Sequence, residues 1–134
     1  MYQSLTLVGN VGKEPEMRYT PSGQAVCAFS LATNNEYTNQ SGEHVKETTW
    51  FRVTTWGKQA EVMGLYVTKG MKVLVEGRLT PDKATGGPRI WTDKEGNAKA
   101  SFEVTAQIVK FLSGGKGEAK QSETVTEADE GLPY

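Results

Sequence analysis

Residues 48–56 read TTWFRVTTW, a stretch rich in β-branched and aromatic side chains. This composition is typical of a β-strand. Side chains of a strand alternate between its two faces, so this stretch has two faces of different chemistry. One face would carry Trp50, Arg52, Thr54 and Trp56, and the other Phe51, Val53 and Thr55.

The hydrophobic period changes directly after this strand. Ala60, Met63 and Val67 recur at the spacing of one helical face, which predicts a helix over 58–68. A basic residue and a glycine at positions 69 and 70 are the usual end of such a helix.

Strand-like alternation recurs in four other segments, which predicts four further strands. These segments are 4–11, 24–34, 71–79 and 101–111. Within 71–79, Met71, Val73, Val75 and Leu79 would point inward. The polar stretch 34–47 is expected to be a long hairpin loop, and 80–100 a long excursion broken by Pro and Gly.

Three strands, a helix and two more strands form the order of an oligonucleotide-binding fold, the OB-fold. The expected fold is therefore all-β, a five-stranded Greek-key barrel with one helix. In that fold the second and third strands and two long loops form the ligand groove. Another five-stranded antiparallel barrel is the alternative that strand count alone leaves open.

Charge divides the chain into two parts. The formal net charge is −1, but residues 1–111 hold thirteen Lys/Arg and eleven Asp/Glu, whereas residues 112–134 hold two lysines and five acids. From position 121 onward there are four acids and no base. We expect a folded domain over 1–111 and a flexible, disordered acidic tail over 112–134 that interacts with other molecules.

Other features argue against several classes of protein. One cysteine, Cys27, excludes an internal disulfide, and no apolar run reaches the length of a membrane span. The N-terminus lacks the pattern of a signal peptide, so we expect a cytoplasmic protein, in the bacterial cytosol or nucleoid. The one histidine, His44, has no evident catalytic or metal-binding partners. We therefore expect a binding protein without cofactor or metal, not an enzyme.

The face with Trp50, Arg52 and Trp56 suits single-stranded nucleic acid. An aromatic ring stacks on any base, and a guanidinium contacts phosphate or takes part in cation–π contacts. Packing of these tryptophans against a loop or another subunit is the structural alternative. Tyr37 and Trp91 fall in the two long loops that would flank the groove. The cations that could follow a phosphate backbone are Arg18, Lys46, Arg52, Lys58, Lys69, Lys72, Arg78 and Arg89.

Several motifs resemble the bacterial single-stranded DNA-binding protein family over residues 1–111. They include LVGNVG at 7–12, EPEMRY at 14–19, WFRV at 50–53, WGKQAE at 56–61, VEGRL at 75–79 and WTD at 91–93. The resemblance implies a homotetramer that binds single-stranded DNA in replication, recombination and repair. The stacking aromatics that it implies are Tyr37, Trp50, Trp56 and Trp91, and the DNA-facing cations are Arg18, Arg52, Lys58 and Lys69.

The C-terminal tip resembles the family's acidic tip, which implies recruitment of replication, recombination and repair proteins. The tip residues are Asp129, Glu130, Gly131, Leu132, Pro133 and Tyr134. Two features depart from the family: a tyrosine stands where phenylalanine is usual, and the stretch 81–88 is rich in Pro and Gly where a simple β-ribbon is more common. Alternatives are a primosome-type OB-fold accessory protein that bridges replication partners, an enzyme on this fold, and an inert solubilising tail.

Overall fold

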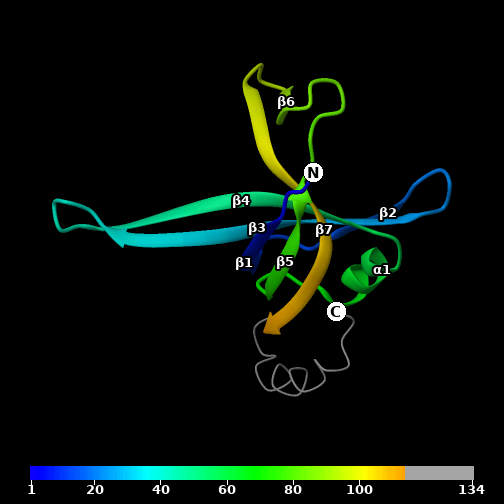
Figure 1. The fold of residues 1–134 in the computed structure, drawn as a ribbon, viewed down its shortest axis with the longest axis horizontal. Coiled ribbons are helices and arrows are strands. Elements are labelled where there is room, and N and C mark those ends of the chain that lie inside the picture. Colours follow the sequence, from blue (N-terminus) through cyan, green and yellow to red (C-terminus); the bar gives the residue numbers. More distant parts are fainter. Residues whose placement is uncertain (114–134) are drawn as a thin grey trace.

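A computed structural model describes residues 1–113, in which seven strands and one helix follow one another along the chain (Figure 1). The elements are β1 (Leu5–Val11), β2 (Glu16–Tyr19), β3 (Ala25–Thr38), β4 (His44–Trp56), α1 (Gly57–Tyr66), β5 (Lys72–Leu79), β6 (Arg89–Thr92) and β7 (Ala98–Ser113). The residues at 114–134 lie outside the described part.

Five of the strands close into a barrel in the order β1-β5-β7-β4-β3. A short pairing of β1 with β3, at Asn10↔Ala32 and Val11↔Leu31, joins the two ends of the sheet. Strands β4 and β7 run parallel, whereas the other barrel pairs are antiparallel. The predicted OB-fold barrel with a helix between its third and fourth strands is confirmed.

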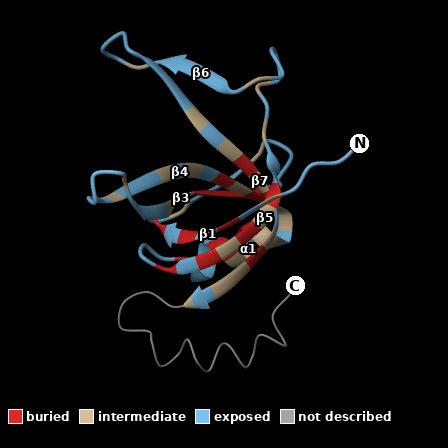
Figure 2. Cartoon of the chain, turned by 60° about the vertical axis from the view of Figure 1, so that its left-hand side comes forward, coloured by how far each residue is buried: buried red, intermediate tan, exposed pale blue. Residues whose placement is uncertain are grey.

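The core fills the barrel and the space under α1 (Figure 2). Ala60, Met63 and Val67 are all at most 3% exposed, as their helical spacing predicts. The helix itself ends at Tyr66, two residues earlier than expected. Val67 has extended backbone and still reaches the core, because an apolar side chain is buried as well from a loop as from a helix.

The expected loop over 34–47 is wrong. Strands β3 and β4 pair out to Thr38↔His44, so the turn occupies only residues 39–43, and the hairpin extends far beyond the barrel (Figure 1). Its side chains pair across the strands: Thr48 Oγ1 donates to Asn34 Oδ1 at 2.8 Å. Residues 34–47 show no apolar alternation because both faces of this extension meet solvent, and backbone pairing between strands does not require apolar side chains.

The excursion at 80–100 also contains regular structure. Strand β6 pairs with the beginning of β7, from Arg89↔Ser101 to Thr92↔Ala98, and forms a ribbon that rises from the barrel (Figure 1). In the turn, Asp93 Oδ1 accepts hydrogen bonds from the backbone N–H groups of Glu95 and Asn97. A simple β-ribbon was not expected at 81–88, and the residues that follow this stretch form the ribbon instead.

One inward position on β5 was predicted wrongly. Leu79 is 50% exposed although it pairs with the fully buried Val104, because it is the last residue of the strand. A side chain at Gly77 would place its Cβ 2.1 Å from the carbonyl oxygen of Thr105, so only glycine allows the strands to approach here. Among residues 1–113, no helix is long and apolar enough to cross a membrane.

Candidate nucleic-acid interface

The two faces of β4 differ as its alternation predicts. Trp50 and Trp56 are 53% and 44% exposed, whereas Val53 and Thr55 are fully buried. The hydroxyl of Thr55 donates to the carbonyl oxygen of Cys27 at 3.0 Å, which satisfies the one polar group on the inner face. Both tryptophans are therefore available to a ligand in this chain.

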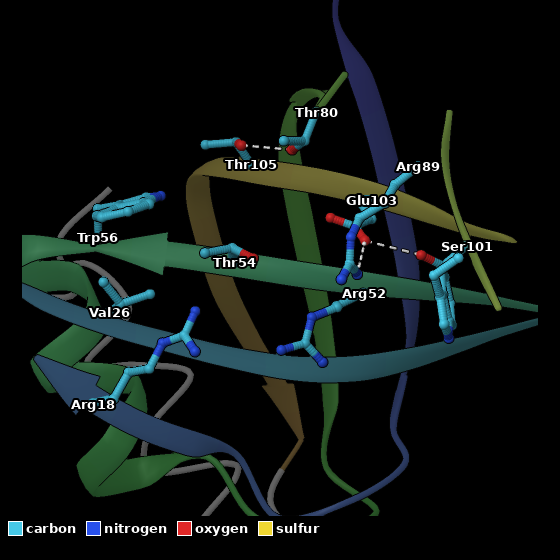
Figure 3. A pocket seen from close by; sticks show the side chains of 11 residues that line it. Arg18, Val26, Arg52, Thr54, Trp56, Thr80, Arg89, Ser101, Glu103 and Thr105 are labelled. Atoms are coloured by element: carbon cyan, nitrogen blue, oxygen red, sulfur yellow. Dashed lines mark hydrogen bonds and ion pairs between the residues drawn. The ribbon is translucent and has the colours of Figure 1, made fainter. Parts of the chain in front are cut away.

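A pocket of about 570 Å³ opens over the end of β4 that carries Trp56 (Figure 3). Side chains from β2, β3, β4, β6 and β7, together with the residue that follows β5, line it. The lining residues are Arg18, Val26, Arg52, Thr54, Trp56, Thr80, Arg89, Trp91, Ser101, Glu103 and Thr105.

The pocket brings together five of the residues predicted to bind nucleic acid. They come from three separate strands, β2, β4 and β6, and are Arg18, Arg52, Trp56, Arg89 and Trp91. The parallel pairing places β7 edge to edge with β4, so residues of both strands line one pocket, and the ribbon of β6 and β7 brings Arg89 and Trp91 to the same place. Two aromatic rings therefore stand in one pocket with three guanidinium groups.

Positive charge dominates the pocket, because three arginines and one glutamate line it. Arg52 Nη2 lies 3.8 Å from Glu16 Oε1, and Arg89 Nη1 lies 3.2 Å from Glu103 Oε2. The guanidinium carbon of Arg89 lies 5.1 Å from the ring centroid of Trp91, within the range of a cation–π contact. This cation–π pair holds both groups at the pocket wall.

The other two predicted aromatics lie outside this pocket. The ring of Trp50 lies against Gly12, where an added Cβ would be 2.4 Å from Trp50 Cζ3. Tyr37 is on the hairpin extension of β3, 43% exposed, and its hydroxyl donates to Glu47 Oε2 at 3.2 Å. The carboxylate of Glu47 raises the pKa of Tyr37. Tyr37 thus belongs to a strand, not to the loop in which the sequence placed it.

The remaining predicted cations are spread over the surface and do not line the pocket. Lys46 is on the hairpin extension, opposite Glu36, and Lys58 is in the first turn of α1. Lys69 follows α1, and Lys72 begins β5, at the opposite end of that strand from the pocket. Arg78 pairs with Thr105 near the pocket and is exposed.

Four polar lining residues were not predicted as part of the site: Thr80, Ser101, Glu103 and Thr105. The sequence carried a signal for three of them, because Phe102, Val104 and Ala106 alternate and thus place Ser101, Glu103 and Thr105 on the other face of the strand. Val104 and Ala106 are buried, whereas Phe102 is 58% exposed. Their position beside β4 depends on the parallel pairing Arg52↔Glu103 and Thr54↔Thr105. That long-range pairing has no local signature.

The predicted partner-binding residues at 129–134 lie outside the described part of the chain. Within residues 1–113, no group of three or more His, Cys, Asp or Glu side chains could hold a metal ion. Burial raises the pKa of the Cys27 thiol, which lies in the core and not at the pocket.

A protein-family model matches nearly all of the residues that the structure describes. The model of the single-strand binding protein family matches residues 2–112. The chain belongs to this family. Two members of similar sequence are called single-stranded DNA-binding protein. One, from Neisseria meningitidis, is 38% identical, and the match covers 81% of this chain and 58% of that protein. The other, from Wolinella succinogenes, is 36% identical over 84% of this chain and 65% of that protein. The chain thus matches about three fifths of the length of these relatives.

Solved structures of the family share the fold. A deletion mutant of the Thermus aquaticus single-stranded DNA binding protein matches with a TM-score of 0.65 and 34% identity, over 83% of this chain and 50% of that one. The Plasmodium falciparum SSB in complex with ssDNA matches with a TM-score of 0.67 and 25% identity, over 84% of this chain and 96% of that one.

Proposed function

We propose that this chain binds and protects single-stranded DNA without requiring a particular base sequence. The observation that carries the proposal is the pocket in which Trp56 and Trp91 stand beside Arg18, Arg52 and Arg89. Aromatic rings stack on the faces of all four bases, and guanidinium groups pair with the phosphates between them. Family membership and the name of the solved complex with ssDNA support the same conclusion.

The proposed path of the strand follows the outer face of β4. It runs from the pocket at Trp56 and Trp91 toward Trp50, which is six residues and therefore about 20 Å away along the strand. Tyr37 on the hairpin extension would continue the path. The cations proposed to contact phosphates along it and beside it are Arg18, Lys46, Arg52, Lys58, Lys69, Lys72, Arg78 and Arg89.

Titration of tryptophan fluorescence with oligo(dT) at two salt concentrations tests this function. Single strands are expected to quench the emission strongly, because bases stack on exposed indole rings, and a duplex of the same sequence is expected to leave it unchanged. Binding should weaken as salt rises, because phosphate contacts release counterions. Equal quenching by duplex and single strand would contradict the proposal.

The proposal includes a homotetramer. Strand β1 pairs with β5 from Leu5 to Asn10 on one side, and on its other side pairs with β3 only at Asn10 and Val11. Within residues 1–113 this leaves an open strand edge from Leu5 to Gly9 that a second copy could extend. Sedimentation at micromolar concentration is expected to give about four times the 14.6 kDa chain mass, and a monomer would contradict this part.

The proposal also assigns separate tasks to the domain at 1–111 and the tail at 112–134. The domain would coat DNA during replication, recombination and repair in the bacterial cytoplasm. Residues 129–134 of the tail would recruit partner proteins by entering an apolar pocket whose rim is basic. Four acids and no base from position 121 onward support this assignment, because acidic side chains can meet a basic rim on a partner. The same acids, tethered near the DNA groove, would compete with DNA for its cations until DNA binds.

Truncation after Ala128 tests the tail. The shortened chain should bind DNA more tightly at low salt, lose this gain at high salt, and no longer bind partner proteins. Unchanged DNA affinity at low salt would contradict the competition, and unchanged partner binding would contradict the recruitment.

A further inference from the structure

One carboxylate stands inside the arginine-lined pocket. Glu103, on β7, lines the pocket, and its side chain is only 15% exposed. A pocket that only held phosphate would be weakened by this charge, because a carboxylate repels phosphate at close range. Glu103 therefore requires an explanation that phosphate binding does not supply.

The two oxygens of Glu103 have different surroundings. Oε2 accepts from Arg89 Nη1 at 3.2 Å and from Ser101 Oγ at 2.9 Å. Oε1 has no hydrogen-bond partner among residues 1–113. Figure 3 shows this second oxygen turned away from Arg89 and Ser101, toward the side of the pocket where Thr54 and Trp56 lie. One oxygen fixes the side chain, and the other presents an unused acceptor to the pocket.

The fixed oxygen also links Glu103 to the stacking surface. Arg89 bridges the carboxylate and the Trp91 ring, because its guanidinium contacts both. A base that stacks within this pocket turns its hydrogen-bonding edge toward the pocket wall, where Oε1 is located. Oε1 can only accept, so it distinguishes bases by the donors on that edge.

We propose that Glu103 is a specificity-determining residue that favours bases carrying an exocyclic amino group over thymine and uracil. The amino group of cytosine donates freely to a carboxylate, a pairing that is common in base readout. The single N–H of uracil or thymine lies between two carbonyl oxygens, which repel the carboxylate. The inference rests on the proposed function, and it adds a modest bias at one nucleotide of a strand of any sequence.

The test compares short oligo(dC) and oligo(dU) of equal length, which differ in base only at C4 and N3. The chain should bind oligo(dC) more tightly by about three- to tenfold, roughly half of the discrimination of a bidentate contact. Replacing cytosine with N4,N4-dimethylcytosine, which has no amino donor, should abolish this preference without any change to the protein. Equal affinity of the unaltered chain for oligo(dC) and oligo(dU) would overturn the inference.

Glu103→Gln separates readout from positioning. The amide oxygen must remain on the side of Arg89 and Ser101, because both donate to it, so the amide NH₂ replaces the acceptor that Oε1 presented. The dC:dU preference should therefore disappear or invert, while the loss of charge tightens binding of both. A preference that stays unchanged in this variant would show that Glu103 only positions Arg89.

Glu16→Gln is the matched control, because Glu16 also pairs with an arginine of the pocket but does not line it. Both homopolymers should bind it more tightly by a similar factor, with the dC:dU ratio of the unaltered chain. A collapsed ratio in this control would assign the preference to general electrostatics and overturn the inference. If neither homopolymer binds the unaltered chain, the proposed function itself fails, which is a different result from equal binding of both.

Discussion

The two faces of β4 are built from alternate residues of one strand and share almost no property. The outer face exposes Trp50 and Trp56 and contributes Arg52 to a positively charged pocket. The inner face buries Val53 and Thr55 completely in the barrel. The difference shows that the two-residue period of a strand can assign core and interface separately, so changes on the two faces should have separable effects.

The largest effect is expected on the inner face, from Val53→Ala. Val53 is fully buried, and the change removes two carbons and leaves a cavity. The expected loss is about 2–3 kcal/mol in the free energy of unfolding. Denaturant titration at fixed protein concentration measures it. The folded variant should keep its affinity for single-stranded DNA, and a large loss of affinity in the folded protein would mean that the two faces are not independent.

On the outer face, Trp56→Ala and Trp50→Ala should act on binding. Stacking of a base on an aromatic ring contributes about 1–3 kcal/mol, which corresponds to roughly 5- to 150-fold weaker binding. Fluorescence anisotropy of labelled oligo(dT) measures the affinity without relying on the tryptophan that is removed. Both variants should have an unfolding free energy close to that of the unaltered chain, because both rings are about half exposed.

Phe51→Ala is the matched control from the inner face. Phe51 packs against the core, and its ring centroid lies 5.7 Å from that of Phe102. The change should reduce stability or assembly and leave the DNA affinity of the folded protein unchanged. The assignment of the faces would be inverted if folded Phe51→Ala lost DNA binding while Trp50→Ala kept it.

The sequence predicted this strand well and its surroundings less well, for a physical reason. Alternation in residues 48–56 is local, so the faces of Trp50 and Val53 could be read from one stretch. The meeting of Trp56 with Trp91 depends on the ribbon of β6 and β7 and on the parallel pairing of β4 with β7, and this second pairing joins residues as far apart in the chain as Phe51 and Phe102. Glu103 was missed for the same reason.

The hairpin extension shows a different limit. Tyr37 was placed in a loop because polar residues surround it, but backbone pairing continues to Thr38↔His44. Hydrogen bonds between polar side chains, such as Tyr37 to Glu47, accompany this ladder. Hydrophobic period detects strands that bury one face, and this extension buries neither.

A smaller effect is expected from the charge on the outer face. Arg52→Gln removes one proposed phosphate contact, so the slope of log affinity against log salt should become shallower by about 0.7 for a single strand. Lys83→Gln is the control, because Lys83 is an exposed cation that does not line the pocket. Equal changes of slope in both variants would show that total charge, and not the pocket, sets the salt dependence.

The smallest effect is expected from Gly12, against which the Trp50 ring of the outer face packs. An added Cβ at Gly12 would lie 2.4 Å from Trp50 Cζ3 and 2.9 Å from Ser30 Oγ, so the indole ring must move in Gly12→Ala. The ring is half exposed and has room to turn away, so the unfolding free energy should change by less than about 1 kcal/mol. Affinity for oligo(dT) should fall by about two- to fivefold, because the displaced ring stacks less well on a base.

A double-mutant cycle decides whether this loss passes through Trp50. Residues in contact show coupling, and the effect of one change disappears when its partner has already been removed. Gly12→Ala should therefore weaken binding in the unaltered chain and have no further effect in Trp50→Ala. If both changes weaken binding additively, Gly12 acts on DNA by another route, and the position of the Trp50 ring does not depend on its packing against Gly12. Coupling would instead show that Gly12 belongs to the same binding surface as the outer face of β4, because the absence of a side chain at Gly12 determines where the Trp50 ring lies.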